Sequence, residues 1–226
     1  MEINQSHGKK LFPGELALLL GLIINSISVT LFAKSKAGMS TIALASYVLN
    51  LVFSFFSFGT WNYIVQCTMI IFLVILTKQI KKGYVISFFL AILYGSLIDL
   101  FNIIISTLSD TLPLYFLYYC VGFCGMALGT CLLFRCCMPV LPFDTFTRDI
   151  SLKFHISYKK IRTGFDISSL LLSSALCLIF IGSIKGVGIG TVINALMMGM
   201  AVSAVSNMFN KKFYFKPVLK CFESLS

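Results

Sequence analysis

Residues 84–106 read Tyr-Val-Ile-Ser-Phe-Phe-Leu-Ala-Ile-Leu-Tyr-Gly-Ser-Leu-Ile-Asp-Leu-Phe-Asn-Ile-Ile-Ile-Ser, and Asp99 is the one charged side chain in this run. An α-helix rises about 1.5 Å per residue, so about 20 apolar residues cross a hydrocarbon layer about 30 Å thick. The run is long enough and apolar enough to do so. We therefore predict a transmembrane helix here.

Five further stretches resemble this run in length and composition. The chain of 226 residues is 58% apolar and 12% charged, against roughly 25% charged residues in soluble domains. This composition excludes a disordered chain, a collagen-like chain, a disulfide scaffold and an ordinary soluble enzyme. Continuous apolar runs also exclude a transmembrane β-barrel, whose strands alternate. The sequence predicts an all-α membrane protein, one integral membrane domain over 1–226, with six transmembrane helices at 14–33, 60–77, 84–106, 112–134, 166–184 and 187–208.

The basic residues predict the orientation of these spans. Lys and Arg number 18 against 8 acidic residues, which gives a net charge of +10. Over alternate loops, all but three basic residues fall on one side, and the other side holds Lys34, Lys36 and Lys185. Because basic residues are enriched in cytoplasmic loops, we expect both termini in the cytoplasm. No soluble domain is present to carry a basic face, so we expect no nucleic-acid partner.

Two connections between the spans are unusually long. Residues 34–59 form an apolar segment on the outer side, which predicts a half-helix that dips into the membrane or packs on the bundle. Residues 136–165 form the inner connection, and they place Phe143, Phe146, Ile150 and Phe154 on one face of a helix. This pattern predicts a short amphipathic helix that lies at the inner interface.

The two halves of the chain match when the sequence is shifted by 104 residues. Repeat A covers about 12–106 and repeat B about 112–208, and a cytoplasmic tail follows at 209–226. Each half contains three spans, so the second half enters the membrane from the opposite face. This order predicts inverted-topology repeats, although six helices of similar length also superpose at some offset. The matched pairs are Gly21 with Gly125, Thr41 with Thr145, Asn62 with Asp166, Ala91 with Ala195, and Gly95 with Gly199.

Polar side chains inside the spans and at their ends are candidates for a solute pathway. A carboxylate in the hydrocarbon costs roughly 2.5–3.5 kcal/mol on insertion scales, so it normally faces a cavity or a partner. The alternative is a structural hydrogen bond across the bundle, and Asp166 can also cap its helix. The candidates are Asp99, Asn102, Asp166, Asn62, Asn194, Ser40, Thr41 and Asp144.

Sequence motifs of catalysis or metal binding are not found in the chain. The two histidines, His7 and His155, have no cysteine or glutamate partner at metal-ligand spacing. No serine-hydrolase elbow or nucleotide-binding loop occurs. We therefore expect no enzymatic activity, no cofactor and no bound catalytic metal. Gly125 and Gly129 form a GxxxG pair that predicts close helix packing.

Several motifs together resemble the YczE/YyaS/YitT-like family of bacterial multipass membrane proteins. They are residues 188–199 (Gly-Ile-Gly-Thr-Val-Ile-Asn-Ala-Leu-Met-Met-Gly), 141–144 leading to 164–166, 94–99, 38–41 and 47–50. The resemblance covers most of residues 12–208. It implies an integral protein of the bacterial inner membrane that serves as a transporter, and it names no substrate. The family motif places a glycine near position 143, where this chain has Phe143.

The sequence favours a small-solute transporter that works by alternating access. A proton or ion gradient would drive it, because no nucleotide site is present. One alternative is a six-helix substrate-binding subunit of an energised uptake complex, which Ala17 and Gly21 could dock to a partner helix. A second alternative is an assembly factor that transports nothing. The expected partners are the lipid bilayer, a small solute, and a second copy or a partner membrane subunit.

Overall fold

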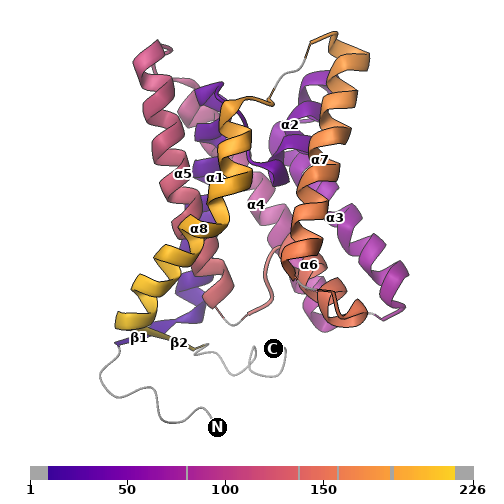
Figure 1. Ribbon diagram of the computed structural model, residues 1–226, viewed down its shortest axis with the longest axis vertical. Helices are drawn as coiled ribbons and strands as arrows, with labels where there is room; N and C mark the ends of the chain where they lie inside the picture. Colours follow the sequence, from indigo (N-terminus) through magenta and orange to yellow (C-terminus); the bar gives the residue numbers. More distant parts are fainter. Residues whose placement is uncertain (1–9, 80, 137, 157, 184–185, 217–226) are drawn as a thin grey trace.

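A computed structural model describes residues 10–216 except 80, 137, 157, 184 and 185. In this part of the chain, eight helices and two short strands form (Figure 1). The elements are β1 (Lys10–Pro13), α1 (Gly14–Ser35), α2 (Thr41–Val52), α3 (Phe58–Thr77), α4 (Lys82–Ser106), α5 (Leu112–Arg135), α6 (Pro142–Phe154), α7 (Tyr158–Ile181), α8 (Ile189–Lys212) and β2 (Phe213–Lys216).

Six of these helices are long and apolar enough to cross a membrane, as the sequence predicted. They are α1, α3, α4, α5, α7 and α8, and the apolar faces of the last two are largely exposed. The chain is therefore a multipass membrane protein. Helix α7 begins at Tyr158 rather than 166, and α8 continues to Lys212. Hydropathy marks only the apolar part of a helix, so polar turns at its ends are missed.

Helices α1 and α5 form the closely packed centre of the bundle. A Cβ atom added to Gly125 would lie 2.5 Å from Ser28 Oγ, and one added to Gly129 would lie 2.4 Å from Asn25 Oδ1. The expected close packing of the glycine pair is confirmed. In the same contact between α1 and α5, Gly21 lies against Leu133 and the backbone of Gly129. The prediction that Gly21 helps to dock a partner helix is therefore wrong, because α5 already covers it.

The two long connections each contain a short helix inside the bundle. Helix α2 packs against α3 and α7 and fully buries Leu44 and Val48, as expected for a half-helix on the bundle. Helix α6 also forms. Phe146 and Ile150 of its apolar stripe pack against α3 and Phe143 is buried, whereas Phe154 at the end of the helix is exposed. Its polar face is buried as well, since Asp144 and Asp149 are both less than one-tenth exposed. We expected an interfacial helix, but its first turns are part of the core.

Asp149 ties α6 to the start of α4. Its carboxylate accepts hydrogen bonds from Tyr84 Oη at 2.7 Å and Lys81 Nζ at 2.9 Å, and Arg148 Nε lies 3.2 Å away. Burial of the carboxyl opposes ionisation, but these hydrogen bonds and the charge of Arg148 hold the pKa of Asp149 below its usual value. The ionised carboxylate therefore stabilises the folded protein fully at pH values above the pKa of an unfolded aspartate, about 3.9. This stabilisation is lost as the pH falls through the pKa of Asp149 in the folded protein, which lies lower.

Replacing Asp149 with Ala should lower the free energy of unfolding at neutral pH by about 1–3 kcal/mol, because the buried Tyr84 hydroxyl loses its acceptor. The difference from the parent should shrink in acid, below roughly pH 4. Unfolding of the purified protein in detergent, followed against pH, measures both effects. Asp110→Ala is the control, because the Asp110 carboxylate is 56% exposed and its ion pair with Lys34 should contribute little to stability. If the free energy of unfolding fell equally in the two variants, the proposed stabilising contact of Asp149 between α6 and the start of α4 would be contradicted.

The two ends of the described chain meet in a small parallel sheet. Strand β1 pairs with β2 in the register Lys10 with Phe213 through Pro13 with Lys216. The rings of Phe12 and Phe215 lie 5.3 Å apart, and the Arg135 guanidinium stands 5.7 Å from the Phe215 ring. The sequence predicted only a tail after residue 208, and its last ten positions lie outside the described residues. Both ends therefore lie on the same side of the bundle (Figure 1).

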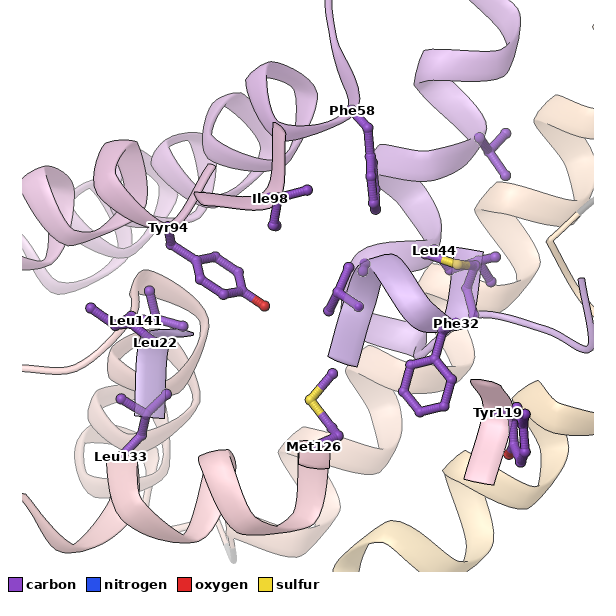
Figure 2. Close-up of a cluster of buried hydrophobic side chains, with 14 of the residues drawn as sticks. Leu22, Phe32, Leu44, Phe58, Tyr94, Ile98, Tyr119, Met126, Leu133 and Leu141 are labelled. Atoms are coloured by element: carbon purple, nitrogen blue, oxygen red, sulfur yellow. The ribbon is translucent and has the colours of Figure 1, made fainter. Parts of the chain in front are cut away.

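The main apolar core joins the two halves of the chain. Figure 2 shows most of its side chains, and the cluster takes residues from α1, α2, α3, α4, α5 and α7 and from the segments before α2 and α6. The Tyr94 ring extends from α4 toward the centre of this cluster. Phe32 packs on Tyr119 with ring centroids 5.3 Å apart. Val29, Ala43, Tyr94, Met126 and Leu141 of this core also line the smallest of the cavities described next.

Candidate functional site

A large cavity of about 910 Å³ lies between α7 and α8 and reaches inward to α2 and α5. Its walls come from the N-terminal half of α7 and from α8 beyond residue 193, so it lies toward the end of the molecule where the two strands meet. The ribbons of α7 and α8 diverge in the same direction (Figure 1). Its polar lining residues are Ser40, Thr41, Thr130, Thr163, Asp166, Asn194, Ser203, Ser206 and Asn207.

Asp166 and the first residue of α2 are hydrogen-bonded in the wall of the large cavity. Thr41 Oγ1 donates to Asp166 Oδ1 at 2.7 Å, and Ser169 Oγ donates to the Thr41 carbonyl at 2.8 Å. Opposite on α8, Asn194 is 4% exposed, and neither atom of its amide has a hydrogen-bond partner among the described residues. A carboxylate and an unpaired amide thus face a cavity large enough for a small organic solute, for which about 300–1,000 Å³ is usual.

A second, much smaller cavity lies deeper in the bundle, and we call it the inner chamber. Its volume is about 40 Å³, and it shares Ser40, Ile42, Met126 and Thr130 with the large cavity. The first residues of α2 and of α6 both reach it, so the two short helices begin on either side of one space. Its polar lining residues are Asn25, Ser40, Asn62, Gln66, Tyr94, Thr130 and Asp144.

The polar atoms of the inner chamber are only partly paired. Gln66 Nε2 donates to Asn62 Oδ1 at 2.6 Å. Within the described residues, Asn25 Oδ1, Ser40 Oγ and Gln66 Oε1 have no hydrogen-bond partner. Each unpaired buried polar group costs about 1–3 kcal/mol, so these three atoms would stabilise water or a small polar ligand in the chamber.

The charge of both cavities is opposite to that of the whole chain. Asp144 borders the inner chamber and Asp166 borders the large cavity, and among the residues that the structure describes no Lys, Arg or His lines either one. Arg135 is near the mouth of the large cavity, where its guanidinium donates to Ser206 Oγ at 2.6 Å. In a protein of net charge +10, this arrangement favours cationic or neutral ligands over anions.

Asp144 also borders a third cavity, of about 780 Å³, between α4, α5 and α6. This side cavity is lined by Lys81, Arg148 and Asp149, and Asp149 forms an ion pair with each of the two basic residues. It lies at the same end of the molecule as the mouth of the large cavity. The inner chamber is thus bordered by two larger spaces on the side of the chain termini.

The structure brings most of the sequence-predicted residues together and leaves two apart. Ser40, Asn62 and Asp144 line the inner chamber, and Ser40 with Thr41, Asp166 and Asn194 line the large cavity. Asp99 and Asn102 border neither. Asp99 instead accepts from Gly59 N at 2.8 Å and from Ser57 Oγ at 2.5 Å, at the start of α3, and Asn102 is exposed on α4.

Sequence reasoning missed several polar residues of the inner chamber. Gln66 stands four residues after Asn62 in an otherwise apolar span, and that spacing puts two amides on one helix face. The spacing of these two amides could have identified Gln66 as a candidate from the sequence. Thr130 and Tyr94 carry no comparable signal, because a lone hydroxyl in a span commonly bonds its own helix backbone.

The end of the molecule opposite the termini is closed by a junction of two loops. Met39 N donates to the Gly186 carbonyl and Gly190 N donates to the Ala37 carbonyl, both at 2.9 Å. Tyr119 Oη donates to the Gly190 carbonyl at 2.8 Å. We call this the loop junction: residues 36–40 with residues 186–191. Gly186 has a φ of +78° and Gly38 a φ of +137°, which glycine adopts readily.

Comparison with known proteins places the chain in a family. No curated protein and no solved structure matches it. The resemblance to the YczE/YyaS/YitT-like family has no support in these comparisons and stays a prediction. One family model matches residues 13–207, which include α1 to α7, helix α8 up to residue 207, and every cavity-lining residue. The chain therefore belongs to the family of unknown function DUF6198.

Proposed function

We propose that the chain is a secondary transporter that moves a small solute by alternating access between two inverted repeats. The packing of helices supports the repeat. Helix α1 packs on α5, its counterpart in the second half, and the contacts α2–α7, α1–α4 and α2–α3 recur as α6–α3, α5–α8 and α6–α7. Matching elements thus occupy matching places.

One contact breaks this equivalence, and this single observation carries the proposal. Helices α3 and α4 pack so closely that a Cβ atom on Gly95 would lie 2.6 Å from the Gly59 carbonyl oxygen. The equivalent residue of Gly95 is Gly199 on α8, and a Cβ atom there would meet nothing within 4 Å among the described residues. The large cavity occupies the space between α7 and α8 instead. Two repeats in different arrangements are what alternating access requires.

The open and closed ends define the state of the proposed transporter. The large cavity lies toward the end with the chain termini, and the loop junction closes the other end. The distribution of basic residues favours a cytoplasmic location for the termini. The described state is then open to the cytoplasm, and transport needs a second state in which α7 and α8 come together and the loop junction separates.

The orientation of the chain can be tested by reporter fusions in bacteria. A reporter that is active only in the cytoplasm should be active when fused after residue 82 or after residue 226, and inactive after residue 110. The expected reason is the enrichment of basic residues on the side that holds the termini. Activity after residue 110 would reverse the assignment of the open end.

The carboxylate in the large cavity should decide which solutes are carried. We expect solutes that are cationic or neutral, since Asp166 is the one charged side chain that lines the cavity in the described part of the chain. Asp166→Asn should lower the flux of a cationic solute by at least tenfold and change the flux of a neutral one less, because charge-assisted hydrogen bonds contribute about 1.5–3 kcal/mol. Flux into proteoliposomes, screened over small amines and neutral polar solutes, measures this.

Asp99→Asn is the matched control for Asp166→Asn, because it neutralises a carboxylate that lies outside both cavities. Its flux per folded molecule should match the parent. If both variants lost flux to the same extent, the cause would be a general effect of the missing charge on the fold and not a change in the cavity. An absence of flux for every solute would favour the non-transporting assembly factor, and flux only with an ATPase partner would favour the uptake-complex subunit.

A further inference from the structure

The turn between α2 and α3 exposes a cluster of aromatic rings, which we call the aromatic patch. Its members are Phe53, Phe55, Phe56, Trp61 and Phe180. The ring centroid of Phe55 lies 4.6 Å from that of Phe56 and 5.6 Å from that of Trp61, and Phe53 lies 5.7 Å from Phe180 of α7. Phe55 is nonetheless 68% exposed and Phe180 is 58% exposed. An exposed aromatic surface of this kind is typical of an interaction site rather than a core.

The aromatic patch lies at the level where two membrane spans end. Phe180 is in the last turn of α7, at the end of the molecule opposite the chain termini (Figure 1). Trp61 is in the first turn of α3, a span of 20 residues that begins at Phe58. At a rise of about 1.5 Å per residue, this span covers about 30 Å, the thickness of the hydrocarbon layer. Trp61 therefore lies within about 5 Å of the boundary of that layer.

The neighbouring carboxylate of Asp99 agrees with a position at this boundary. Asp99 of α4 accepts from Gly59 N at 2.8 Å, and Gly59 is in the same first turn of α3 as Trp61. Carboxylates are costly at the centre of a bilayer and are tolerated near its surface. The aromatic patch is therefore placed at the edge of the hydrocarbon and not deep within it.

The composition and hydrogen bonding of the turn indicate lipid around it. Residues 37–77 contain no Asp, Glu, Lys, Arg or His. Trp61 Nε1 donates to the Phe53 carbonyl at 3.0 Å, and Asn50 Nδ2 donates to the Phe56 carbonyl at 2.9 Å. Non-helical backbone needs such partners within the protein where water is scarce. The connection between α4 and α5 at the same end differs, because it carries Asp110, whose side chain is 56% exposed.

We propose that the aromatic patch inserts into the headgroup layer of the bilayer on the side opposite the chain termini. Phospholipid is the partner, because indole rings favour this layer and the phenyl rings favour the adjoining part of the acyl chains. The turn between α2 and α3 then stays out of bulk water, and the ends of α2, α3 and α7 are held at one depth. This insertion requires neither transport nor a particular orientation of the chain.

The fluorescence of Trp61 measures the depth of the aromatic patch in the unaltered protein, because the chain has one tryptophan. The purified full chain is placed in nanodiscs of phosphatidylcholine whose acyl chains are dibrominated at carbons 6 and 7 or at carbons 11 and 12. The shallow bromines should quench Trp61 at least twice as strongly as the deep ones. The aqueous quencher acrylamide should act at least fivefold less on Trp61 than on free N-acetyltryptophanamide.

Two relocated tryptophans, each in a Trp61→Phe background, are the matched controls. Phe72→Trp lies about 16 Å further along α3 at a position that is 52% exposed, so the deep bromines should quench it best. Leu108→Trp lies beside Asp110 in the connection between α4 and α5, so acrylamide should quench it best. Trp61 quenched as Leu108→Trp would place the patch in water, and quenched as Phe72→Trp would place it in the hydrocarbon. Quenching by neither reagent would show that protein covers it, and each of these three results would overturn the proposal.

Discussion

Substituting Phe for Gly199 should strongly reduce solute transport in a protein that still folds. A Cβ atom at this position meets nothing within 4 Å among the described residues, and Gly199 lines the large cavity, so we expect the open state to accommodate the larger side chain. The closed state should bring α7 against α8 at Gly199, as α3 packs against α4 at Gly95. Overpacking such an interface costs roughly 1–3 kcal/mol, and each 1.4 kcal/mol is about tenfold in population. Flux should fall by about one to two orders of magnitude.

Gly95→Phe is the matched control for this experiment, because it places the same side chain at the equivalent position of the other repeat. There a Cβ atom would lie 2.6 Å from the Gly59 carbonyl oxygen and 3.0 Å from Tyr63 Cδ1. This variant should lower the unfolding temperature, whereas Gly199→Phe should leave it close to the parent value. Flux in proteoliposomes and thermal unfolding in detergent measure the two effects. Parent-like flux in Gly199→Phe would contradict a closing movement of α8.

The second large effect is expected at the loop junction. A Cβ atom on Gly188 would lie 2.3 Å from the Ala37 carbonyl oxygen, which already accepts from Gly190 N. The clash is with backbone, so Gly188→Val should force the two loops apart. The proposed transporter then favours the state that is open at this end. Cys177 provides a native reporter, because it is fully buried near the end of α7 on the same side.

Alkylation of Cys177 by a small thiol reagent, followed by peptide mass spectrometry, measures the opening. Its rate should rise at least tenfold in Gly188→Val, since the parent thiol is shielded from solvent. Gly164→Val is the control, because a Cβ atom there meets nothing within 4 Å in the described part of the chain. An unchanged alkylation rate in Gly188→Val would show that the junction does not act as a gate.

Asp99 and Asp144 show where reading polar residues from the sequence fails. Both carry carboxylates near apolar residues, and sequence reasoning gave more weight to Asp99 because it stands within a span. The structure uses Asp99 to hold the start of α3, through Gly59 N and Ser57 Oγ, and places Asp144 at the inner chamber. Which face of a helix a residue occupies relative to its neighbours depends on packing, and a single sequence does not contain that information.

Hydropathy, helix period and small side chains are local properties, so the amino-acid sequence was enough to predict the six membrane spans, the short helices in both long connections and the close contact on the glycines of α5. It also placed Ser40, Thr41, Asn62 and Asp166 among the candidate residues. The three-dimensional packing was needed to show that α2 and α6 begin at one chamber, that Gln66 and Asn25 line it, and that α7 and α8 stand apart. These features depend on contacts between residues far apart in the chain, and such contacts are set by the packing of whole helices.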